Sequence, residues 1–115
     1  MVVAMKLEQA LALIREIPDF PVPGIRFQDI TPLLSNGAAF SAVTKSLACI
    51  DVEATLIAGI EARGFILASA LANERSAGFI PIRKGGELPH STLAQSYGLE
   101  YGVDTLEMHV DAIAA

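Results

Sequence analysis

The sequence predicts an α/β protein in which helices flank a parallel sheet. Two short apolar runs, residues 54–60 and 79–82, have the length of buried strands, and an Ala- and Leu-rich segment, residues 64–73, lies between them. A strand–helix–strand unit of this kind forms a parallel pair with a right-handed crossover. The chain has 115 residues, of which 52% are hydrophobic and 18% charged, so we expect one folded domain rather than disorder.

Charge and cysteine content exclude several classes of protein. Eight Lys and Arg against thirteen Asp and Glu give a net charge of −5, which argues against a nucleic-acid binder with a broad basic surface. The single cysteine, Cys49, allows no intrachain disulfide, so a secreted disulfide-rich domain is excluded. No signal-like N-terminus and no membrane-length apolar run are found, so we expect a cytoplasmic protein without a membrane partner.

The first half of the chain predicts two helices around an irregular segment. Apolar residues recur at helical spacing over residues 5–17, and Pro18 ends this helix. Four prolines and a glycine oppose a regular helix over residues 18–32, whereas its Phe and Ile side chains indicate that the segment packs. A second helix is expected over residues 38–48, followed by Cys49, which we interpret as a buried and unreactive residue.

The second half predicts a long loop and then a strand pair. Residues 83–96 are polar, contain glycines and lack periodicity, so we expect a functional loop that is mobile without ligand. Residues 97–101 and 105–110 are expected to form strands joined at residues 102–104, the second with one solvent-exposed face.

Two basic segments follow the two strands of the predicted parallel pair. Arg63 stands at the strand-to-helix junction, where free helix amides and a guanidinium suit an anion such as phosphate. The alternative is a loop arginine paired with Glu61. Arg83 and Lys84 come directly after the second strand, and the alternative for them is a solvated loop. Because ligands bind at the carboxyl ends of parallel strands, the two segments support each other.

Two further groups have candidate chemistry. Glu100 lies between Tyr97 and Tyr101, and a carboxyl shielded by aromatic rings can have a raised pKa and donate a proton. The alternative is an exposed strand residue. His109 alternates with Glu107 and Asp111, which offers metal ligands, although a solvent-exposed strand face is the interpretation that we favour.

Several motifs resemble one known family, the adenine phosphoribosyltransferases. They are IPDFPVPGIRFQDITPLL (residues 17–34), GIEARGF (59–65), GFIPIRKGGELP (78–89), SYGLEYG (96–102) and LEMHVDAI (106–113). The resemblance implies an incomplete type I phosphoribosyltransferase fold in a single domain, residues 1–115. In it a hood segment, residues 18–34, would cover the base and a β-hairpin would carry a flexible loop. It also implies a purine-salvage reaction, in which adenine and phosphoribosyl pyrophosphate, bound with Mg²⁺, give AMP and pyrophosphate.

The resemblance assigns roles to individual residues. Phe27 would stack on adenine, and its neighbours Arg26 and Ile25 would present backbone groups to the ring edge. Arg63 would bind pyrophosphate during catalysis, and Glu100 would handle the proton of the base. The remaining matches are Arg83 and Lys84, on a loop that closes over pyrophosphate across a homodimer interface, and Tyr101, on the phosphate side. No residue of the chain is assigned to a metal.

The sequence also departs from the family pattern. Gln28 and Glu87 stand where the family usually has arginine and lysine. The family continues with a buried strand, an acidic pair and a 5′-phosphate loop, so we expect this chain to be an N-terminal part that makes no AMP at an appreciable rate by itself. The alternatives are a non-catalytic fragment or a nucleotide- or pyrophosphate-binding module. A transferase for another base fits the hood and the Leu-Glu-Tyr-Gly stretch less well.

Overall fold

The structure is a computed structural model that describes residues 4–99 and 102–113. It divides into two compact units, Met1–Val52 and Glu53–Ala115.

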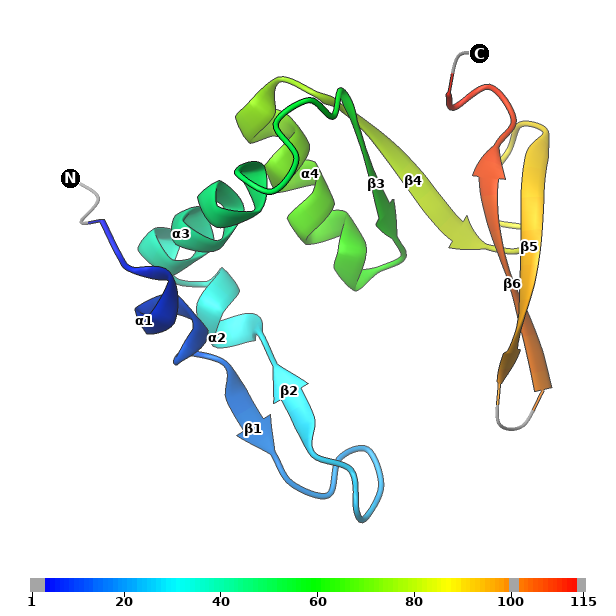
Figure 1. The fold of residues 1–115 in the computed structure, drawn as a ribbon. Coiled ribbons are helices and arrows are strands. Elements are labelled where there is room, and N and C mark those ends of the chain that lie inside the picture. Colours follow the sequence, from blue (N-terminus) through cyan, green and yellow to red (C-terminus); the bar gives the residue numbers. More distant parts are fainter. Residues whose placement is uncertain (1–3, 100–101, 114–115) are drawn as a thin grey trace. The chain divides into compact units, whose positions relative to one another are not determined.

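The first unit places a small two-stranded sheet beside three helices (Figure 1). Its elements are α1 (Leu7–Leu11), β1 (Arg15–Ile17), β2 (Phe27–Asp29), α2 (Thr31–Leu34) and α3 (Gly37–Ala48). Three buried residues, Ala10, Leu33 and Ala39, form its core, one from each helix. Partly buried apolar side chains from the same helices and their flanks pack around them. The predicted second helix is confirmed as α3.

The predicted first helix is wrong in its second half. The helix ends at Leu11, and Arg15–Ile17 forms β1, which pairs antiparallel with β2 so that Arg15 lies opposite Asp29. Pairing of the two strands gives hydrogen-bond partners to the backbone of β1, and the ion pair between Arg15 and Asp29 adds to their stability. Together these interactions outweigh the weak preference of the segment for a helix.

The proline-rich segment is more regular than predicted. It contains β2 and the start of α2, a single turn in which Pro32 occupies one of the first positions. Proline is tolerated there because its missing N–H would have no partner inside the helix. The expectation that Cys49 is buried is wrong, because the residue follows the last turn of α3 and is exposed.

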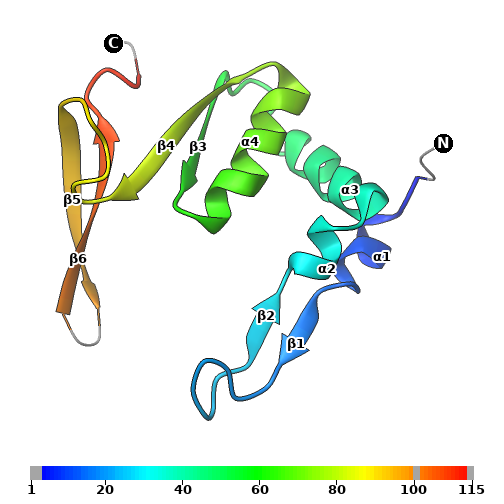
Figure 2. The same ribbon diagram turned by 180° about the vertical axis from the view of Figure 1, so that it is seen from behind.

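The second unit is a four-stranded mixed sheet with one helix against its parallel part. Its elements are β3 (Leu56–Ile60), α4 (Arg63–Arg75), β4 (Gly78–Lys84), β5 (Thr92–Leu99) and β6 (Gly102–His109), in the sheet order β3-β4-β6-β5. The strands β3 and β4 are parallel, which confirms the strand–helix–strand unit. Figures 1 and 2 show α4 beside both strands, and the ring of Phe65 on α4 meets that of Phe79 on β4 edge to face.

Strand burial and loop length differ from the expectations. Only Gly59 is buried among the five residues of β3, because α4 covers one face of the strand and the other is exposed within the described chain. The predicted loop over residues 83–96 shrinks to residues 85–91, since β4 extends to Lys84 and β5 begins at Thr92. The predicted strand pair is confirmed as β5 and β6, but the predicted connection at residues 102–104 is wrong, because these residues belong to β6 and Gly102 pairs with Leu99.

Candidate functional site

The carboxyl ends of the two parallel strands meet at one end of the sheet. Glu61 follows β3 directly, and its backbone N–H donates to the carbonyl oxygen of Ile82 on β4 at 2.9 Å. The strand β4 continues from there to Arg83 and Lys84. The structure therefore brings the two basic segments singled out in the sequence to the same edge, as predicted from the strand order.

A close backbone contact holds the start of α4 against β3. A Cβ atom on Gly59 would lie 2.6 Å from the carbonyl oxygen of Gly64 and 2.7 Å from the Cβ of Ala68. Only glycine fits at this position. The contact fixes the first turn of α4, where exposed Arg63 is the first helical residue. Free N–H groups and the positive end of the helix dipole are therefore presented beside Glu61.

The carboxylate of Glu61 binds the end of β4. Its Oε1 accepts hydrogen bonds from Arg83 Nε at 3.2 Å and from the backbone N–H of Lys84 at 3.0 Å. These two bonds, that from Lys84 first, hold the pKa of Glu61 below its ordinary value. Glu61, the partner considered for Arg63 in the sequence, is thus a partner of Arg83. Sequence reasoning missed this pairing, which the parallel register could have suggested.

A second carboxylate lies on the other side of Arg83. Glu87 Oε2 is 3.8 Å from Arg83 Nη2, and Arg83 Nη1 donates to the Glu87 carbonyl oxygen at 3.5 Å. Glu87 is one of the two departures from the family pattern, and here it balances part of the positive charge of the loop. An external anion would have to compete with both carboxylates for this guanidinium.

The hood segment contains an ordered loop that is closed by short-range hydrogen bonds. The N–H of Phe20 donates to the carbonyl oxygen of Ile25 at 3.1 Å, and the N–H of Gly24 donates to Asp19 Oδ1 at 2.9 Å. Phe27 and Phe20 meet edge to face with ring centroids 5.2 Å apart. Ile25 is exposed, and Arg26 pairs with Glu16 at 3.1 Å on the surface. The segment therefore offers an aromatic pair beside a shaped backbone loop.

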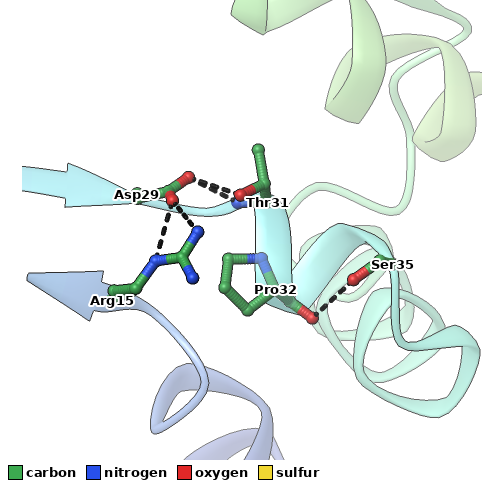
Figure 3. A network of polar contacts seen from close by, with 5 residues as sticks. All are labelled: Arg15, Asp29, Thr31, Pro32 and Ser35. Atoms are coloured by element: carbon green, nitrogen blue, oxygen red, sulfur yellow. Dashed lines mark hydrogen bonds and ion pairs between the residues drawn. The ribbon is translucent and has the colours of Figure 1, made fainter.

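A polar network anchors the downstream end of the hood segment (Figure 3). Asp29 Oδ2 accepts from Arg15 Nη2 at 2.6 Å and Nε at 3.1 Å, and Oδ1 accepts from the hydroxyl and the N–H of Thr31 at 2.7 and 2.9 Å. The Thr31 hydroxyl, the Thr31 N–H and Arg15 together lower the pKa of Asp29 to about 2. This carboxylate joins β1, β2 and the first turn of α2.

Glu100 and Tyr101 lie outside the described residues. Their neighbour Tyr97 donates to Asp104 at 3.3 Å, and burial, together with the Asp104 charge, raises the pKa of this phenol. Residues 4–99 and 102–113 contain no group of three or more His, Cys, Asp or Glu side chains arranged to hold a metal ion.

The carboxylate of Glu107 has a different role from the metal ligation considered for it. It accepts hydrogen bonds from Thr92 and from the backbone of Gly86, and these lower its pKa.

Within the part of the chain that the structure describes, no helix is both long and apolar enough to cross a membrane.

Comparison with known proteins identifies relatives. No family model matches the chain. It is 56% identical over 104 residues to the adenine phosphoribosyltransferase of Agrobacterium fabrum, covering 89% of this chain and 58% of the relative. A protein of the same name from Roseiflexus sp. is 58% identical over 104 residues, covering 89% of this chain and 60% of its own length.

Solved structures agree with the sequence relatives. The crystal structure of the Rhodothermus marinus adenine phosphoribosyltransferase superposes with a TM-score of 0.82 at 51% identity, covering 93% of this chain and 62% of that one. The Giardia lamblia enzyme complexed with 9-deazaadenine gives 0.88 at 39% identity, covering 97% and 64%. The expected α/β class is thereby confirmed. Sequence and fold both relate this chain to the adenine phosphoribosyltransferases, over about three-fifths of their length.

Proposed function

We propose that the chain supplies the base-binding and pyrophosphate-binding segments of an adenine phosphoribosyltransferase. This purine-salvage enzyme would transfer the phosphoribosyl group of phosphoribosyl pyrophosphate to adenine, which gives AMP and pyrophosphate. The observation that carries the proposal is the cluster at the carboxyl ends of β3 and β4. There Arg83 and the N–H of Lys84 bind one carboxylate, that of Glu61, and α4 begins two residues after it, at Arg63.

The cluster suits a pyrophosphate group on chemical grounds. It already binds an anion, the Glu61 carboxylate, through a guanidinium and a backbone N–H. Arg63 adds a cation at the start of α4, where helix N–H groups favour negative charge. Transfer from phosphoribosyl pyrophosphate releases a highly charged leaving group, so cations placed around it stabilise the transition state. In this proposal Arg63, Arg83 and Lys84 provide them.

The hood segment suits a planar base. Phe27, already in contact with Phe20, would stack on adenine, and backbone groups of Ile25 and Arg26 would face the ring edge. The Giardia lamblia relative, solved with 9-deazaadenine, supports an adenine-like ligand. By the family resemblance Glu100 would exchange the proton of the base and Tyr101 would lie beside the phosphate.

The family resemblance also implies Mg²⁺, a homodimer and a cytoplasmic location. No described acidic cluster could hold a metal, so Mg²⁺ would arrive bound to the phosphates of the substrate, as is usual for this ion. Its chemistry would be to neutralise phosphate charge. A homodimer would let the loop after β4 close over a neighbouring site, and the cytoplasm is where we place the protein.

Calorimetric titration of the purified chain tests the proposal. Phosphoribosyl pyrophosphate with Mg²⁺ should bind, and Arg83→Ala should weaken that binding while leaving adenine binding unchanged. Phe27→Ala should have the opposite pattern. Replacing adenine by hypoxanthine or guanine tests the base. Equal affinity for the three bases would contradict an adenine enzyme, and Arg83→Ala binding as tightly as the unaltered chain would contradict the pyrophosphate site.

A further inference from the structure

A single carboxylate joins both ends of the loop that follows β4. One oxygen of Glu107 accepts from the backbone N–H of Gly86 at 2.6 Å, and the other accepts from the hydroxyl of Thr92 at 2.7 Å. Gly86 lies near the start of the loop over residues 85–91, and Thr92 is the first residue of β5. Glu107 lies on β6, the strand between β4 and β5 in the sheet.

The position of Glu107 follows from the sheet register. Arg83 on β4 lies directly opposite Glu107 on β6, so the two residues share a face of the sheet. Arg83 nevertheless bonds Glu61 and Glu87, whereas Glu107 bonds the loop. The register thus places Glu107 opposite a cation, but its hydrogen bonds stabilise the loop.

The tied segment is a tight turn whose geometry depends on glycine. The N–H of Glu87 donates to the carbonyl oxygen of Lys84 at 3.3 Å, which makes residues 84–87 a β-turn. Gly86 is the third residue and has a φ of +86°, as a type II turn requires. A side chain disfavours that φ, so the turn needs its glycine, and the bond from the Gly86 N–H to Glu107 holds the turn against β6.

We propose that Glu107 is a positioning residue that shapes the basic turn after β4 and thereby sets the affinity of Arg83 and Lys84 for a pyrophosphate group. This inference rests on the proposed function. The carboxylate touches no ligand in this account. It acts by ordering the turn before binding, so that less conformational freedom is lost when the anion arrives.

The sign of the effect separates this role from simple electrostatics. Removing a negative charge from beside Arg83 should tighten anion binding if charge alone matters. Loss of an ordering contact should weaken it instead. Glu87→Ala is the matched control, because it also removes one negative charge near Arg83 but leaves both bonds of Glu107 in place.

The experiment measures amide exchange at Gly86 and calorimetric affinity for inorganic pyrophosphate in the full chain. In Glu107→Ala we expect Gly86 to exchange about tenfold faster and pyrophosphate to bind about tenfold more weakly, as loss of a charge-assisted hydrogen bond predicts. Glu107→Gln keeps one acceptor oxygen and should recover part of both. Thr92→Val should give a smaller loss of pyrophosphate affinity, because it removes one of the two hydrogen bonds to Glu107. Glu87→Ala should bind pyrophosphate at least as tightly as the unaltered chain.

Two results overturn the inference in different ways. In the first, Glu107→Ala binds pyrophosphate as tightly as the unaltered chain although Gly86 exchanges faster. This would show that the hydrogen bonds of Glu107 order the turn without affecting the affinity. The same conclusion follows from unchanged binding by Thr92→Val if Glu107→Ala does not fold. Absence of pyrophosphate binding by the unaltered chain would overturn the proposed function and this role with it.

Discussion

Replacing Gly59 by alanine tests whether the β3–α4 junction is built on backbone contact. The new Cβ would lie 2.6 Å from the Gly64 carbonyl oxygen and 2.7 Å from the Ala68 Cβ, both well below the 3.4 Å at which ordinary contact begins. One obstacle is backbone and the other is a buried alanine, so neither can rotate away. Overpacking of this kind costs about 1–3 kcal/mol of unfolding free energy. We expect Gly59→Ala to destabilise the second unit by that amount.

The assay is urea unfolding followed by far-UV circular dichroism, together with hydrogen exchange of the β3 and α4 amides. Gly98→Ala is the matched control, because Gly98 also lies in a strand and its added Cβ would meet nothing within 4 Å. We expect Gly59→Ala to lower the midpoint and to accelerate exchange in α4, and Gly98→Ala to change both much less. If the two variants unfolded at the same urea concentration, the close packing of α4 on β3 would be refuted.

Three further predictions concern single groups. The pKa of Asp29 is depressed to about 2, so its stabilising contribution is complete above its ordinary pKa of 3.8 and disappears as the pH falls through 2. Acid titration of stability should therefore be flatter in Asp29→Asn. Arg63→Ala should weaken binding of phosphoribosyl pyrophosphate by about 1.5–3 kcal/mol, measured by calorimetry, and unchanged affinity would contradict the assignment. Protease cleavage within residues 85–91 should slow when pyrophosphate is added, and equal cleavage rates would argue against a closing loop.

Local patterns predicted the parts of the fold whose residues contact close neighbours in sequence. The strand–helix–strand unit was predicted because its apolar runs and its Ala- and Leu-rich helix differ clearly in length and composition. The α3 helix was predicted for the same reason. The failure at residues 12–17 has a physical cause, since the pairing of Arg15 with Asp29 is set by a strand fourteen residues away, which helical periodicity does not report.

The candidate site was predictable in place but not in detail. Parallel strand order alone brings the segments containing Glu61 and Arg83 to one edge. Their pairing, and the second carboxylate from Glu87, depend on side-chain geometry after the turn. The role of Glu107 was not predicted for another reason. Its alternation with His109 indicated an exposed strand face, but the loop folds back onto that face and hydrogen-bonds to the Glu107 carboxylate.

Titration of the isotopically labelled chain, followed by amide resonances, tests whether the ends of β3 and β4 bind pyrophosphate and whether the hood segment binds adenine. Inorganic pyrophosphate should shift the amides of residues 61–64 and 83–86, and adenine should shift those of residues 20–29. Each ligand should shift its own segment more than any other described part of the chain. Pyrophosphate shifts spread over the chain without a maximum at the ends of β3 and β4 would contradict the account, as would the absence of shifts in the hood segment with adenine.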